Sequence, residues 1–279
     1  MEPLKITALT DFSELSKIAI EYALKMTSKL DCEFTVINVV RMDGVPKTSL
    51  KMKQLERTML QIVEEEGARL VEELKKSAKG KTTITFRAIR SHTVADTIKR
   101  YNEKNRANLI VMGSRGASAI KKVILGGTTV SVIDICNAPV LAIPEKAGFK
   151  NFKHVVYASD LKNVQKELDT IIPFARIFDS NIHMVHVTES MDKKMEAKKL
   201  SAEELIRKAN YNKIDLRFVL DDDVPSAIDR YIKERDGDLL TTFTHELNLF
   251  EKLFARSITR KLAYQGTMPL LAFKRKAVV

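Results

Sequence analysis

The chain has 279 residues, enough for one large or two ordinary domains, and its 44% hydrophobic and 30% charged residues are typical of a globular protein. No apolar run approaches the roughly 20 residues of a membrane-spanning helix, and the N-terminal sequence lacks a signal-peptide pattern. We therefore expect a cytoplasmic protein with no membrane partner. The formal net charge is +11, but basic residues alternate with acidic ones and no basic run contains aromatic residues. This favours solvated helix faces and predicts no nucleic-acid partner.

The chain contains two cysteines, Cys32 and Cys136. Two cysteines without a metal-binding spacing make neither a disulfide framework nor a metal motif. We expect both to pack as small buried groups in a reducing compartment.

Apolar runs and helical patterns alternate through the first half of the chain. This alternation predicts a parallel sheet with helices on both faces. In chain order, the expected elements are a strand over Lys5–Leu9, a helix from Ser13, a strand over Phe34–Val40, a helix over Leu50–Ser77, a strand over Thr83–Ile89, a helix over Val94–Asn105, a strand over Leu109–Met112, a helix over Thr129–Asn137 and a strand over Val140–Ile143.

The longest expected helix, Leu50–Ser77, is amphipathic and ends before Gly80, a residue suited to the position after a helix. Apolar residues at helical spacing predict a single buried face along its length. The residues of that face are Leu55, Met59, Ile62, Leu70 and Leu74.

Four glycines surround the end of the fourth strand. The apolar run Leu109–Met112 is followed by Gly113 and Gly116, and Gly126 and Gly127 precede the next helix. Glycine lets a ligand approach the backbone closely, and the first N–H groups of a helix favour an anion such as phosphate. For any single glycine, a strand end or helix start is a sufficient explanation. The four together make phosphate binding a competing hypothesis.

The second half of the chain repeats the first. Asp179–Val187 matches Asp31–Val39, and Pro269 matches Pro139. The repeat predicts two tandem α/β domains with a boundary near Glu145–Lys153.

The two predicted domains comprise residues 1–146 and 151–279. Pro173 falls within the first helix of the second domain, and we expect it to kink or split that helix.

The second domain lacks the glycines of the first. The positions of Gly113, Gly116 and Gly126 are occupied there by Phe243, Glu246 and Arg256. A phenylalanine removes the room for a ligand, and a glutamate repels phosphate. We therefore expect a degenerate second domain that keeps the fold and has lost the site.

The sequence resembles the universal stress protein family in its tandem form. Gly113, Gly116 and Gly126 fit the glycine spacing of that family, and the turn Thr10–Ser13 fits the end of its first strand. The resemblance implies two tandem five-stranded parallel sheets of strand order 3-2-1-4-5, each flanked by helices on both faces. It also implies a ligand between the carboxyl ends of strands 1 and 4, where the strand order reverses.

The resemblance further implies an adenine nucleotide, ATP or AMP, as cofactor, with Mg²⁺ arriving only with the nucleotide. Asp11 would contact the ribose, and Val39 would offer its backbone to the adenine. The implied cofactor-binding residues are Thr10, Asp11, Val39, Gly113, Arg115, Gly116, Gly126, Gly127 and Thr128.

Two of these residues have alternative explanations. Asp11 could cap the helix that starts at Ser13, and this role is compatible with a ribose contact. Arg115 could pair with a phosphate, but an exposed surface charge is the simpler interpretation.

Two positions depart from the family pattern. Gly127 stands where the family has serine or threonine, so that Thr128 or Thr129 would have to supply the hydroxyl. His92 stands where relatives have a glycine after the third strand, which would crowd the adenine.

Other polar clusters have structural explanations. His183 and His186 are three residues apart in an expected strand, point to opposite faces and cannot share a metal. Asp221–Asp223 precedes Pro225 and a helix, which indicates capping. The chain has no Walker loop and no nucleophile elbow, so we expect no enzyme and no metal site, with weak ATP hydrolysis as a minor alternative.

The leading hypothesis is a cytoplasmic stress-response regulator whose N-terminal domain binds an adenine nucleotide. The alternative is a ligand-free interaction module in which both sites are degenerate. In either case we expect a pseudo-dimer within one chain, formed by the fifth strands Val140–Ile143 and Leu270–Phe273 because the edge of a parallel sheet needs cover. Association of two chains into a homodimer is also open.

Overall fold

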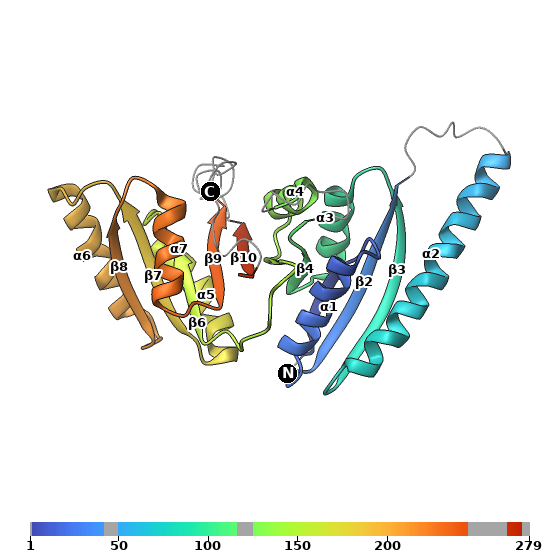
Figure 1. The fold of residues 1–279 in the computed structure, drawn as a ribbon, viewed down its shortest axis with the longest axis horizontal. Helices are drawn as coiled ribbons and strands as arrows, with labels where there is room; N and C mark the ends of the chain where they lie inside the picture. Colours follow the sequence, from blue (N-terminus) through green and yellow to red (C-terminus); the bar gives the residue numbers. More distant parts are fainter. Residues whose placement is uncertain (1, 42–49, 116–124, 245–266, 275–279) are drawn as a thin grey trace. The chain divides into compact units, whose positions relative to one another are not determined.

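The computed structural model describes residues 2–41, 50–115, 125–244 and 267–274. The chain divides into two compact units, Met1–Glu145 (unit 1) and Lys146–Val279 (unit 2). Each unit consists of parallel strands connected by helices, the α/β class that the sequence predicts (Figure 1). Among the described helices, none has the length and apolar character needed to span a bilayer.

Unit 1 alternates strands and helices throughout. Its elements are β1 (Leu4–Leu9), α1 (Glu14–Met26), β2 (Cys32–Arg41), α2 (Leu50–Ser77), β3 (Thr82–Ser91), α3 (Val94–Asn105), β4 (Leu109–Gly113), α4 (Gly127–Ile135) and β5 (Val140–Ile143). The strands are parallel neighbours in the order β3-β2-β1-β4-β5. This confirms the expected order, which reverses at β1 because β2 and β4 are its two neighbours.

Unit 2 has the same plan. Its elements are β6 (His154–Ala158), α5 (Val164–Phe178), β7 (Asn181–Thr188), α6 (Lys193–Lys208), β8 (Ile214–Leu220), α7 (Val224–Glu234), β9 (Leu239–Thr244) and β10 (Leu270–Lys274). The strands are parallel neighbours in the order β8-β7-β6-β9-β10. Strand for strand, this is the order of unit 1.

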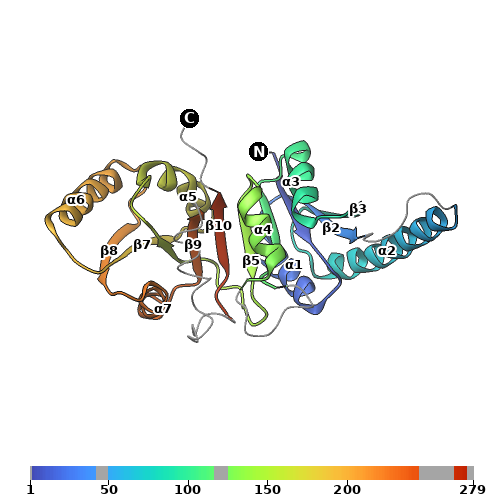
Figure 2. The same ribbon diagram turned by 90° about the horizontal axis from the view of Figure 1, so that it is seen from above.

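Helices cover both faces of the strands in each unit. In unit 1, α1 contacts α2 and α3 contacts α4, and Figure 2 shows α1 and α3 on opposite sides of the strands. In unit 2, α5 contacts α6, and α7 packs against β7. Strands β4 and β5 are buried along their whole length, which accounts for their continuous apolar sequences.

Helix α2 has the expected bounds, but only its second half buries the expected face. The side chains of Leu70 and Leu74 are 3% and 2% exposed, whereas those of Leu55, Met59 and Ile62 are 51%, 38% and 55% exposed. The expectation of a single buried face is therefore wrong for the first half.

The contacts between α2 and β3 explain this difference. The ring of Phe86 lies so close to Gly67 that a Cβ there would be 2.1 Å from it. Glu64 Oε1 accepts a hydrogen bond from Ala88 N at 2.9 Å. These contacts turn α2 toward the edge strand β3, beside which it lies in Figure 1.

Helix α5 continues through Pro173 as a single helix of 15 residues, so Pro173 does not split it, and the alternative expectation of a kink stays a prediction. Proline removes one intrahelical hydrogen bond. Leu168, Ile171, Ile172 and Ala175 are buried on the same helix. Their packing outweighs the lost hydrogen bond.

Candidate functional site

The candidate site lies where the strand order of unit 1 reverses. β1 pairs with β2 from Leu4 to Leu9, and with β4 from Ile6 to Ala8. The carboxyl ends of these three parallel strands therefore lie side by side. This is the position at which open α/β sheets bind ligands.

Thr10 immediately follows β1 and holds the turn together. Its side chain is buried, and its Oγ1 accepts a hydrogen bond from Phe12 N at 2.9 Å and lies 3.0 Å from Ser16 Oγ. Phe12 adopts a left-handed backbone conformation with φ of 60°. The Thr10 side chain thus has a structural role in fixing this turn.

Asp11 is exposed and supports the helix cap without being the cap residue. Ser13 is the N-cap of α1, and its Oγ accepts from Ser16 N. Asp11 Oδ1 in turn accepts a hydrogen bond from Ser13 N at 3.1 Å. The alternative in which Asp11 itself caps the helix is therefore wrong, because the N-cap is Ser13, two residues later.

The same turn occurs in unit 2. Asp160 Oδ1 accepts from Lys162 N at 3.0 Å, and Leu161 has φ of 61°. Because both units build this turn, the aspartate alone does not mark a ligand site. The distinction between the units rests on the glycine stretch.

Val39 lies near the end of β2, two residues beyond the last pair with β1, which is Leu9–Ile37. The neighbouring Asn38 donates from Nδ2 to the carbonyl oxygen of Thr10 at 2.9 Å. Asn38 therefore ties the end of β2 to the end of β1. Sequence reasoning missed this role. An amide side chain at the end of an otherwise apolar strand could have indicated a hydrogen bond to a neighbouring strand.

Gly113 is the last residue of β4, and packing explains why it is glycine. A Cβ at this position would lie 2.9 Å from Leu15 Cγ and 3.2 Å from the carbonyl oxygen of Arg115. Helix α1 therefore passes too close to β4 for a larger residue. This is a structural reason for Gly113 that is independent of any ligand.

A hydrogen bond closes the base of the glycine loop. Gly126 N donates to the carbonyl oxygen of Ser114 at 2.8 Å. The Ser114 hydroxyl is buried and has no hydrogen-bond partner among the described residues. Gly116 lies outside the described residues, so its predicted role stays a prediction.

Helix α4 begins two residues earlier than expected, with Gly126 as N-cap and Gly127 as its first residue. No side chain of the described residues caps this helix. Gly127 is exposed, and a Cβ there would meet no atom within 4 Å. A side chain at Gly127 would thus have room, and the first N–H groups of α4 receive no side-chain cap from the described residues, which is compatible with an anion at the helix start.

Thr128 and Thr129 differ in their suitability as phosphate ligands. Thr129 is buried, and its Oγ1 donates to the carbonyl oxygen of Gly113 at 3.1 Å. Thr128 is half-buried in the first turn of α4. Thr128 is thus the better candidate to replace the hydroxyl that Gly127 lacks.

Arg115 is not an exposed surface charge. Its side chain is 16% exposed, and Nη2 lies 3.2 Å from Glu145 Oε2. The simpler expectation for Arg115 was therefore wrong. A phosphate at this residue would have to compete with a carboxylate.

In unit 2 the position equivalent to Gly113 is filled. Phe243 pairs with Phe273 in register, as Gly113 pairs with Ile143 in unit 1. The Phe243 ring is buried, stacks on Phe273 with centroids 5.0 Å apart and contacts the edge of Tyr157. Glu246 and Arg256, the other two substitutions, lie outside the described residues.

The histidines of β7 have separate partners. His183 Nε2 lies 3.0 Å from His154 Nδ1, and His183 Nδ1 lies 2.5 Å from Asp215 Oδ1. His186 Nδ1 instead donates to the carbonyl oxygen of Ser159 at 2.8 Å. In the part of the chain that the structure describes, no three His, Cys, Asp or Glu side chains are grouped to hold a metal.

The predictions for Asp221–Asp223 and for the thiols have different outcomes. Asp223 occupies the N-cap position of α7, but it makes no side-chain cap hydrogen bond, and its Oδ2 accepts from Ser226 Oγ at 2.5 Å. Cys32 and Cys136 are both free and buried. Burial raises the pKa of the Cys32 thiol.

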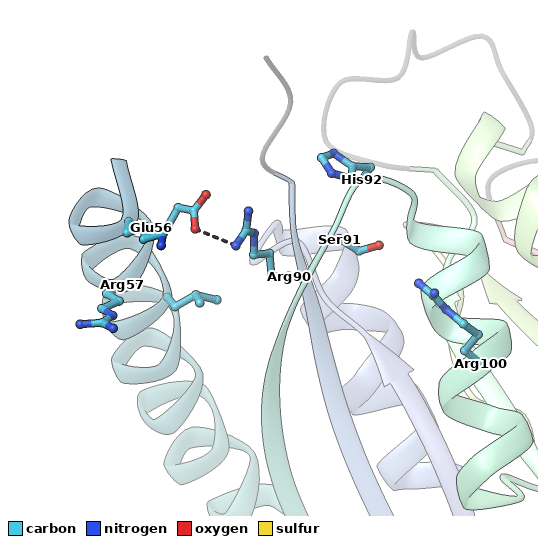
Figure 3. A pocket seen from close by; sticks show the side chains of 8 residues that line it. Glu56, Arg57, Arg90, Ser91, His92 and Arg100 are labelled. Carbon is cyan, nitrogen blue, oxygen red and sulfur yellow. Dashed lines mark ion pairs between the residues drawn. The ribbon is translucent and has the colours of Figure 1, made fainter. Parts of the chain in front are cut away.

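A second concave region of unit 1, which we call the basic cleft, lies at the end of β3. Its volume is about 710 Å³, and His92 is part of its wall (Figure 3). The cleft is lined by Lys53, Glu56, Arg57 and Leu60 of α2, by Arg90, Ser91 and His92 at the end of β3, and by Arg100 of α3.

Comparisons with known proteins place this fold and glycine stretch in a family. The model described as the universal stress protein family matches residues 4–144. A universal stress protein of Methanocaldococcus jannaschii is 29% identical over 139 residues, which are 50% of this chain and 81% of that protein. One of Bacillus subtilis is 26% identical over 144 residues, which are 50% of this chain and 97% of that protein.

A solved structure extends the likeness to both units. A universal stress protein from Archaeoglobus fulgidus has a TM-score of 0.63 and 20% identity, and the match covers 97% of this chain and 96% of that chain. At this identity the match shows the α/β fold. Since the family model matches half of the chain, the chain belongs to the universal stress protein family.

Proposed function

We propose that unit 1 binds an adenine nucleotide, ATP or AMP, as a regulatory ligand in the stress response. The observation that carries the proposal is the start of α4, which no side chain of the described residues caps and where a side chain at Gly127 would meet no atom within 4 Å. The buried hydroxyl of Ser114, which has no hydrogen-bond partner among the described residues, fits a polar ligand at the base of the same loop. In universal stress proteins the corresponding glycine pattern implies a nucleotide.

Each part of the nucleotide would contact a different element: the start of α4, the turn after β1 or the end of β2. The phosphates would lie at the N–H groups of Gly127 and Thr128, where the helix dipole favours negative charge. Asp11 would face the ribose, and the backbone of Val39 would face the adenine beyond the last β1–β2 pair. Mg²⁺ would be held by the phosphates rather than by a protein cage.

We propose binding rather than catalysis, and a cytoplasmic location. No acid, base and nucleophile with mutual geometry is present among the described residues of this region. The two free, buried thiols fit a reducing compartment.

The alternative is a ligand-free interaction module. The missing hydroxyl at Gly127 and the pairing of Arg115 with Glu145 favour it. A mass spectrum of the denatured, freshly purified protein separates the two hypotheses, because co-purified nucleotide is expected only for the binding protein.

Calorimetric titration of the full chain with Mg·ATP and with AMP tests the site directly. We expect Gly127→Glu to weaken binding at least about tenfold, because a carboxylate at the start of α4 repels phosphate. We expect the variant to fold, because a Cβ at Gly127 would have no atom within 4 Å and a negative charge near a helix N-terminus stabilises the helix.

Gly148→Glu is the matched control, since a Cβ at Gly148 also meets no atom within 4 Å. We expect it to bind nucleotide as the unmodified protein does, and all three proteins to unfold at similar temperatures. Absence of binding heat at millimolar nucleotide would contradict the proposal. Equal affinity of the Gly127→Glu variant would contradict the placement of the phosphates.

A further inference from the structure

The cations that line the basic cleft outnumber the carboxylates in the same lining. Four permanent cations line it, Lys53, Arg57, Arg90 and Arg100, against one carboxylate, Glu56. Three positive charges therefore remain uncompensated. The four cations come from α2, β3 and α3.

The single carboxylate is already engaged. Glu56 is 8% exposed and lies 2.7 Å from Arg90 Nη1, the ion pair drawn in Figure 3. This pair fixes the first half of α2 to the end of β3. Lys53, Arg57 and Arg100 form no ion pair with any residue that the structure describes.

Uncompensated cations around a concave surface raise the local affinity for anions. Guanidinium groups suit phosphate in particular, because they donate two parallel hydrogen bonds to its oxygens. Ser91 and His92 add polar groups at the mouth of the cleft. Among the described residues of the lining, Leu60 is the single apolar one, and none is a Phe, Tyr or Trp that could stack on a base.

We propose that the basic cleft is a second ligand site, for a small molecule that carries two or more phosphate groups and is recognised through them. The cleft volume of about 710 Å³ suits a small molecule. The absence of an aromatic lining argues against single-stranded nucleic acid, which binds by stacking its bases.

This site is separate from the proposed phosphate position at α4, and it adjoins the position expected for the adenine, because His92 lines the cleft and Val39 pairs with Ile89, next to Arg90. Arg90 and Ser91 pair with Val40 and Arg41 at the end of β2, and β3 is the outermost strand of unit 1. β2 therefore lies between the basic cleft and the ends of β1 and β4. The two sites can be tested independently.

The experiment titrates the full chain with tripolyphosphate, and uses the Gly127→Glu background to remove phosphate binding at α4. We expect Arg57→Ala with Arg100→Ala to weaken tripolyphosphate binding at least about tenfold, because hydrogen bonds to charged groups are strong. Arg69→Ala with Lys104→Ala is the matched control: both residues are exposed, lie on the same two helices and are outside the cleft lining.

We expect the control pair to change affinity by less than about twofold, and orthophosphate to bind more weakly than tripolyphosphate. Equal weakening in both double variants would show that net charge alone attracts the anion, and would overturn the proposal. Failure of the Gly127→Glu protein to bind tripolyphosphate would overturn it as well. Tighter binding of single-stranded RNA through Arg57 and Arg100 would overturn the assignment to a small molecule.

The outcome does not depend on the nucleotide site. If unit 1 binds no ATP, tripolyphosphate binding in the Gly127→Glu background still tests the cleft. Thermal unfolding of each variant shows that the altered proteins are folded.

Discussion

At the residue scale, the glycine stretch divides into residues that hold the loop and residues that face outward. Gly113 is glycine because Leu15 packs against it, and Thr129 uses its hydroxyl to bond the carbonyl oxygen of Gly113. Gly127 has no such constraint, because a side chain there would meet nothing. We therefore expect the proposed ligand binding to depend on Gly127 and Thr128 more than on the first glycine of the pattern.

His186 gives unit 2 a pH dependence whose sign follows from its burial. Burial lowers the pKa of His186, and the hydrogen bond to Ser159 only partly opposes this. The folded state prefers the neutral ring, whereas the unfolded chain binds a proton near about pH 6.5. The free energy of unfolding should therefore fall as the pH decreases through and below about 6.5.

Thermal unfolding between about pH 7.5 and about pH 5.5 measures this effect. We expect His186→Asn to reduce the pH dependence, and His92→Asn, a change at an exposed histidine of unit 1, to leave it unchanged. An equal slope in the His186→Asn protein would contradict the assignment.

At the element scale, α2 covers the outer edge of β3. The Glu64 carboxylate accepts a hydrogen bond from Ala88 N of the edge strand, and Glu56 forms an ion pair with Arg90. An uncovered edge strand is prone to pair with other chains. The exposed apolar residues in the first half of α2 follow from this orientation.

A matched pair of truncations in α2 tests the orientation. We expect Leu74→Ala to lower the free energy of unfolding by about 2–5 kcal/mol, because its side chain is 2% exposed. Leu55→Ala should change it by less than about 0.5 kcal/mol, because that side chain is 51% exposed. Urea unfolding measures both, and similar losses in the two variants would show that the whole predicted face is buried.

At the scale of the whole molecule, the two units share one strand order but differ at the position of Gly113. At the position equivalent to Gly113, unit 2 carries the ring of Phe243, which stacks on Phe273. We therefore expect one nucleotide per chain, bound by unit 1. The stoichiometry from calorimetric titration checks this, and two equivalent sites per chain would contradict the degenerate character of unit 2.

Association of chains is a separate property. The fifth strands β5 and β10 stay our predicted pairing surfaces, within a chain or between two chains. Chromatography with light scattering measures the number of chains per particle.

The sequence by itself determined the elements and their alternation. The bounds of α2, α3 and β5 agree with the prediction, because local apolar period, caps and breakers govern which backbone hydrogen bonds can form. The internal repeat and the resemblance to universal stress proteins gave the strand order. The positions of Asp11, Val39 and the described glycines followed from that order.

Only the tertiary structure decided which groups meet. The bonds of Asn38 to Thr10 and of Arg115 to Glu145 join residues that are far apart in the sequence. The exposure of Leu55 depends on how α2 turns toward β3, since helical spacing defines a face but not its partner. The basic cleft likewise exists because folding brings residues of α2, β3 and α3 to one lining, and such a set of cations leaves no local pattern in the sequence.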